Sequence, residues 1–61
     1  MFNKGDSVEV INQSLQSFGL IGTIICSHHN AESSFVRFDN WNGNGKKELL
    51  IRNKNLKFKG G

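Results

Sequence analysis

Lysine and arginine side chains gather in the last third of this 61-residue chain. From residue 46 onward there are six cations and one acid, Glu48, a net charge of +5, whereas residues 1–45 carry two cations and four acids, a net charge of −2. Clustered cations bind a phosphate backbone by releasing its counterions, without reading base sequence. The cluster therefore predicts contact with RNA or DNA, with a solvated surface that has no partner as the alternative. The candidate nucleic-acid-binding residues are Arg37, Lys46, Lys47, Arg52, Lys54 and the aromatic Trp41.

A second candidate surface is uncharged. Residues 12–31 contain no Asp, Glu, Lys or Arg, and Phe18 lies there with Leu15, Leu20 and Ile21 close by in the sequence. Trp41 lies in a segment rich in Asn and Gly, where a large ring is a candidate hot spot for a protein or a base, with a lid over the core as the alternative. Apolar side chains that point outward from these segments would form a patch suited to a protein partner. The candidate protein-docking residues are Leu15, Phe18, Leu20 and Trp41.

Cys26, His28 and His29 bring a thiol close to two imidazoles. Structural zinc needs four ligands, in most sites with paired spacing, and the chain has no second cluster of this kind. We therefore expect no metal and no cofactor, with Cys26 in the core and both histidines in a turn. A thiol in apolar surroundings is unreactive. Because no phosphate loop, nucleotide fingerprint or catalytic carboxylate pair is present, the sequence predicts a protein that is not an enzyme.

Short β-strands must position these side chains. Strict alternation of apolar and polar residues marks a half-buried strand, and Val8 and Val10 alternate in this way, as do Val36 and Phe38. No window of the sequence shows helical periodicity. Strands are predicted over residues 7–12, 22–27, 34–39, 48–52 and 56–58, with a hairpin loop at 28–33, a turn at 40–45 and a single helical turn at 53–55.

The expected fold is one all-β domain over residues 1–61, a small five-stranded barrel with one short helical turn before the last strand. Gly22 is expected to allow a close crossing or bend where the barrel folds over. Residues 59–61 are expected to fray. So small a core leaves no room for a deep pocket that would enclose a small-molecule substrate. The predicted core is Val8, Val10, Ile24, Cys26, Val36, Phe38, Leu49, Ile51 and Leu56, with Leu20 or Ile21 closing one end.

Two stretches of the sequence resemble a known family. The segment 4–11, Lys-Gly-Asp-Ser-Val-Glu-Val-Ile, followed by Gly-Thr-Ile at 22–24, is similar to the KOW motif and its SH3-like relatives, and residues 50–56 resemble the ending common in such barrels. The resemblance implies an SH3-like barrel and contacts with RNA or polymerase, as in ribosomal proteins and transcription elongation factors. The long, uncharged loop 12–21 instead resembles the small stromal-side subunit of photosystem I, an SH3-like branch that binds proteins.

Two hypotheses follow for this small basic protein, and both describe a binding module. In the first, the basic third binds RNA or DNA, alone or within a larger nucleoprotein complex. In the second, loop 12–21 and Trp41 dock on a partner protein, as a small inhibitor or regulator of phage type would. A single cysteine and the lack of an apolar leader predict a cytoplasmic location. No run approaches the about 18 apolar residues of a membrane span, so we expect no membrane partner.

Overall fold

The computed structural model describes residues 2–27 and 32–60. Five antiparallel strands form one sheet in the order β4-β3-β2-β1-β5, and one 3-10 turn, η1, precedes the last strand. The predicted all-β class and the helical turn at 53–55 are therefore confirmed. The elements are β1 (Ser7–Val10), β2 (Ile21–Ser27), β3 (Ser33–Phe38), β4 (Lys47–Arg52), η1 (Asn53–Asn55) and β5 (Leu56–Gly60).

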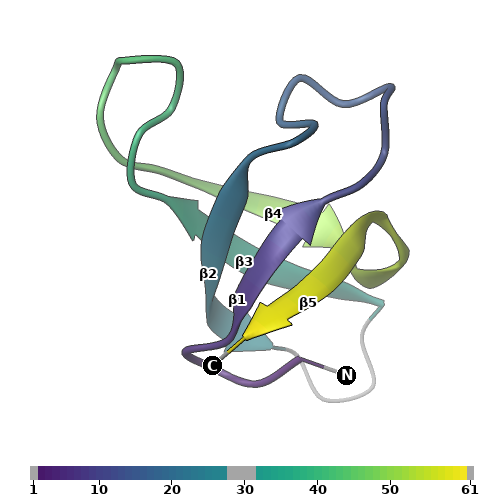
Figure 1. Ribbon diagram of the computed structural model, residues 1–61. Helices are drawn as coiled ribbons and strands as arrows, with labels where there is room; N and C mark the ends of the chain where they lie inside the picture. Colours follow the sequence, from purple (N-terminus) through teal and green to yellow (C-terminus); the bar gives the residue numbers. More distant parts are fainter. Residues whose placement is uncertain (1, 28–31, 61) are drawn as a thin grey trace.

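The sheet is strongly curved but open. In Figure 1, β3 and β4 pass behind β1, β2 and β5, so the two ends of the sheet form separate layers. Strands β4 and β5 are its edges, and no ladder joins them within residues 2–27 and 32–60. The fold is thus consistent with an SH3-like shape, but the described strands form an open sheet and not the closed barrel expected from the sequence.

Gly22 lies where β2 approaches β3 most closely. A Cβ atom at this position would meet Val36 Cγ1 at 2.5 Å and the Arg37 carbonyl oxygen at 2.9 Å. Since real Cβ atoms do not approach a neighbour so closely, only glycine fits without a shift of the surroundings. The predicted role of Gly22 is confirmed.

The core lies on one face of the curved sheet, which we call the inner face. It contains seven of the predicted residues, and Leu20 and Leu49 are half-buried against it. Successive side chains of a strand point to opposite faces of the sheet, so one face collects the apolar residues. Strand β3 shows this most clearly, because every second side chain is buried along its whole length. The buried apolar residues are Val8, Val10, Ile24, Val36, Phe38, Ile51 and Leu56.

The prediction that Cys26 belongs to the core is wrong. Ile24 pairs with Val36 but Cys26 pairs with Phe35, so Ile25 is the extra residue of a β-bulge. The bulge moves Cys26 to the opposite, outer face of the sheet, where it is exposed. The histidine turn that was predicted next to it lies outside the described residues.

The prediction of a frayed C-terminal segment is also wrong for two of its residues. Strand β5 continues to Gly60, which pairs with Ser7. Lys59 Nζ lies 3.6 Å from Glu9 Oε1. Gly61 is outside the described residues. No helix in the described part of the chain is long and apolar enough to cross a membrane.

Candidate functional site

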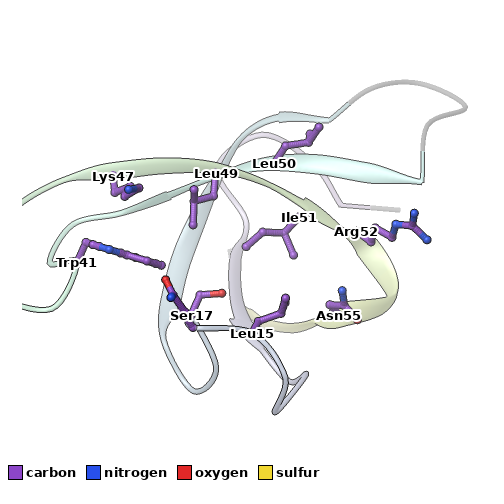
Figure 2. A pocket seen from close by; sticks show the side chains of 10 residues that line it. Leu15, Ser17, Trp41, Lys47, Leu49, Leu50, Ile51, Arg52 and Asn55 are labelled. Atoms are coloured by element: carbon purple, nitrogen blue, oxygen red, sulfur yellow. The ribbon is translucent and has the colours of Figure 1, made fainter.

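A groove of about 430 Å³ lies between β4 and the loop 11–20 (Figure 2). Leu49 and Ile51 point toward it from β4, and Leu15 lies opposite them on the loop. Trp41 stands at one end and Asn55 at the other, so β4 forms one long wall. The lining residues are Leu15, Gln16, Ser17, Trp41, Lys47, Leu49, Leu50, Ile51, Arg52 and Asn55.

The loop wall is held by successive tight turns. The Leu15 N–H donates to the Asn12 carbonyl at 3.1 Å, and the Phe18 N–H donates to the Leu15 carbonyl at 3.0 Å. The Asn12 side-chain amide donates to Asn55 Oδ1 at 3.1 Å, and the Ile11 N–H donates to the Asn55 carbonyl at 2.8 Å. These bonds tie the loop to η1. Leu15 is therefore placed by local turn hydrogen bonds in a loop whose start is bonded to η1.

The turn 40–45 sets Trp41 at the mouth of the groove. Its N–H donates to the Gly45 carbonyl at 2.7 Å, which closes the turn. The Trp41 ring is half-buried and packs against Phe38, with ring centroids 5.5 Å apart and planes tilted by 52°. Lys47 Nζ lies 5.4 Å from the centroid of the Trp41 ring, within range of a cation–π interaction. Trp41 thus combines both expectations, since the ring packs against the core and also lines the groove.

Strand register decides which cations reach the groove. Residues directly opposite each other in an antiparallel pair share a face of the sheet. Lys47 is opposite the buried Phe38 and therefore belongs to the inner, groove side. Arg37 is opposite Glu48 on the outer face, and Arg37 Nε lies 3.4 Å from Asp39 Oδ1. The structure therefore separates Arg37 from Lys47. The same alternation places Arg52, opposite Ser33, on the outer face at the end of β4.

The remaining candidate cations lie toward the two ends of the groove. Lys47 and Arg52 line the groove near its two ends. Lys46 precedes Lys47 in the sequence and Lys54 lies in η1, but neither Lys46 nor Lys54 lines the groove. All four are exposed, and none of them forms an ion pair with another described residue. No Asp or Glu contributes to the lining. The groove is therefore positively charged at both ends.

The protein-docking candidates do not form one surface. Leu15 and Trp41 line the groove together, but Leu20 is half-buried against the core and Phe18 is exposed away from the groove lining. Sequence reasoning missed Ser17 and Asn55, and contacts of Asn55 with Asn12 and Ile11 place Asn55 at the groove. Their residue types carry no signal of this role.

The described residues contain no group of three or more His, Cys, Asp or Glu side chains that could hold a metal ion. The groove offers hydrogen-bonding amides, an aromatic ring, cations and apolar side chains. These groups can bind, but they include no nucleophile paired with a base. Comparison with family models, with curated proteins and with solved structures finds no match to this chain.

Proposed function

We propose that this chain is a non-catalytic, SH3-like binding module that holds single-stranded RNA or DNA in the groove between β4 and loop 11–20. The observation that carries the proposal is Lys47 Nζ at 5.4 Å from the Trp41 ring centroid, in a groove without acidic lining. An aromatic ring beside a cation is the arrangement by which proteins hold unpaired bases and their phosphates. The exposed thiol of Cys26 suits the reducing cytoplasm, where we place this activity.

The length of β4 suits a short stretch of nucleic acid. Lys47 and Arg52 stand at opposite ends of the strand, and at about 3.3 Å per residue their backbones are roughly 17 Å apart. This distance spans a few nucleotides. A base that stacks on Trp41 would contribute about 1–3 kcal/mol, while phosphates interact with the cations at each end. Binding of this kind is weak and tolerates many base sequences.

Salt dependence tests the proposal. Trp41 is the only tryptophan of the chain, so its fluorescence reports the groove during titration with a short single-stranded oligonucleotide. If about four cations contact phosphates, log affinity should fall against log salt concentration with a slope of roughly −3. The double variant Lys46→Ala/Lys47→Ala should bind less tightly at every oligonucleotide sequence and flatten the slope by about one to two units.

The matched control is Lys4→Ala/Lys57→Ala, which removes the same charge from exposed positions outside the groove lining. It should retain most of the affinity of the parent protein. If both double variants lose affinity equally, attraction by net charge explains binding and the groove does not. If neither variant loses affinity, the proposed phosphate contacts are wrong.

The apolar walls of the groove favour a second candidate function. Leu15, Leu49 and Ile51 would suit an apolar segment of a partner protein. Such docking depends little on salt, because it releases few ions. A pull-down from lysate with and without nuclease separates the two functions: a partner protein retained at high salt after nuclease treatment, and lost with Trp41→Ala, would favour protein docking over nucleic-acid binding.

A further inference from the structure

The outer edge of β4 carries backbone groups that the sheet does not use. The Asn53 N–H donates to the Glu32 carbonyl at 2.6 Å, which continues the β3–β4 register beyond the pair of Arg52 with Ser33. Backbone polar groups alternate between the two sides of an antiparallel strand. Since Asn53 bonds toward β3, the alternation turns the N–H and C=O groups of Leu50 and Glu48 away from β3.

Nothing in the described part of the chain pairs with this edge, because β3 is the only strand that pairs with β4. Leu50 is 56% exposed, and Figure 2 shows its side chain pointing away from the groove. A regular strand with a free edge and an exposed apolar side chain is a template for another strand.

The sequence of β4 is complementary to itself. In an antiparallel pair centred on Leu50, Glu48 lies opposite Arg52 of the second strand, and Leu49 lies opposite Ile51. Each pair joins residues of the same face, and the outward backbone groups of Leu50 meet those of the second Leu50. Neither Glu48 nor Arg52 forms an ion pair with another described residue, so both charges are available.

Other registers fit poorly. Centring the pair on Leu49 would place Glu48 opposite Leu50 and Lys47 opposite Ile51, which sets charges against apolar side chains. Centring it on Ile51 would place Leu50 opposite Arg52. Only the register about Leu50 matches opposite charges and apolar side chains together.

We propose that β4 pairs with β4 of a second copy of this chain, antiparallel about Leu50, to form a homodimer with one continuous sheet. The dimer does not rest on the proposed binding of nucleic acid, and it is tested without nucleic acid. Charge complementarity identifies the second copy as the occupant of the edge. A β4–β4 pair buries little area, so the dimer forms at high protein concentration.

Charge reversal tests this register. In sedimentation velocity over increasing concentration, the parent protein should shift from the monomer mass to twice that mass. Glu48→Arg alone and Arg52→Glu alone should each remain monomeric, because like charges then face each other across the pair. An equal mixture of these two variants should dimerise, since each supplies the charge that the other lacks. The double variant Glu48→Arg/Arg52→Glu should dimerise by itself.

Lys4→Glu is the control, because it reverses an exposed charge away from β4 and should dimerise like the parent. Circular dichroism establishes that each variant is folded. If a single variant does not fold, the double variant and the parent still decide the outcome. A parent that stays monomeric at millimolar concentration overturns the proposal, as does a mixture or a double variant that stays monomeric.

The single cysteine supplies a second measurement of the same dimer. Cys26 pairs with Phe35, and Phe35 pairs with Leu50, so one row of outer-face residues leads from β2 to the proposed dimer axis. With strands about 4.8 Å apart, the two Cys26 positions of a dimer are roughly 24 Å apart. Spin labels on Cys26 should report this separation in the parent protein. A dimer whose labels are far outside roughly 20–30 Å would show that another surface mediates it.

Discussion

The two edges of the sheet would offer a second copy of the chain opposite electrostatic environments. On β4, antiparallel pairing about Leu50 sets Glu48 against Arg52. On β5, the same kind of pairing about Phe58 would set Lys57 against Lys59. Like charges directly opposite each other destabilise a strand pair, and lysine is a common protection of edge strands. The β5 edge is therefore protected, whereas the β4 edge is self-complementary.

The two edges also differ in the regularity of the ladders that join them to the rest of the sheet. The β1–β5 ladder has a register shift between Ser7 and Val8, whereas the β3–β4 ladder runs without one. A bulge distorts the edge that a further strand would have to follow. Strand β4 has three charged side chains and β5 has two, so the number of charges does not decide which edge is protected. The sign and position of the charges along the strand decide it.

Both edges depend on the same core, and its loss should have the largest effect. Phe38→Ala removes a fully buried ring and should cost about 3–5 kcal/mol, most of the stability of so small a domain. Circular dichroism should show a largely unfolded chain at 25 °C. Phe58→Ala on β5 is the matched control, because that ring is 54% exposed and should change the melting temperature little. Two variants with equal melting temperatures would contradict the assignment of Phe38 to the core.

The groove lies on the β4 side of the sheet, so aromatic residues near the two edges should differ in binding. Trp41→Ala should weaken binding of a fluorescently labelled oligonucleotide by about 1–3 kcal/mol, with little change in salt slope, because stacking releases no ions. Phe58→Ala should leave the affinity unchanged, since Phe58 does not line the groove. Anisotropy titrations at several salt concentrations measure both. If both variants lose affinity equally, the groove is not the binding site.

The smallest expected effect comes from making the protected edge resemble the other one. Lys57→Glu would set opposite charges across a β5–β5 pair, and each such cross-strand pair contributes roughly 0.2–1 kcal/mol. The same change also sets a glutamate opposite Glu9 of β1, which offsets part of this gain. With both edges then self-complementary, sedimentation should detect species larger than the dimer at high concentration. Lys57→Ala removes the cation without supplying an acid, so this variant should form fewer of the larger species than Lys57→Glu does. Larger species from the parent protein itself would show that the lysines do not protect β5.

Alternation along the chain predicted most of the fold. Polar residues separate Val8 from Val10 and Val36 from Phe38, which predicts that all four belong to the core, and their burial confirms it. Cys26 was misplaced because one extra residue in a strand reverses every later side chain. Neither Ile25 nor its neighbours have a type that distinguishes a bulge from a regular strand.

Residue type predicted part of the candidate site. An aromatic ring in a turn, a cation and a loop leucine predict binding roles for Trp41, Lys47 and Leu15, and all three line the groove. Arg37 was grouped with the cations, yet alternation within β3 places it on the outer face. The contact of Asn12 with Asn55 joins residues 43 positions apart, and it shapes the wall. Hydrogen bonds over such separations leave no local pattern in a sequence.

The pairing of β1 with β5 has a consequence for biosynthesis. Val10 pairs with Leu56 and Ser7 pairs with Gly60, so the first strand of this sheet to be synthesised shares a ladder with the last strand of the sheet. Until residue 60 has emerged, one side of β1 has no partner and the nascent chain cannot complete its sheet. A chain that ends before residue 56 keeps this edge open. Such an open edge is a template for another strand, so truncation would expose the sheet to aggregation.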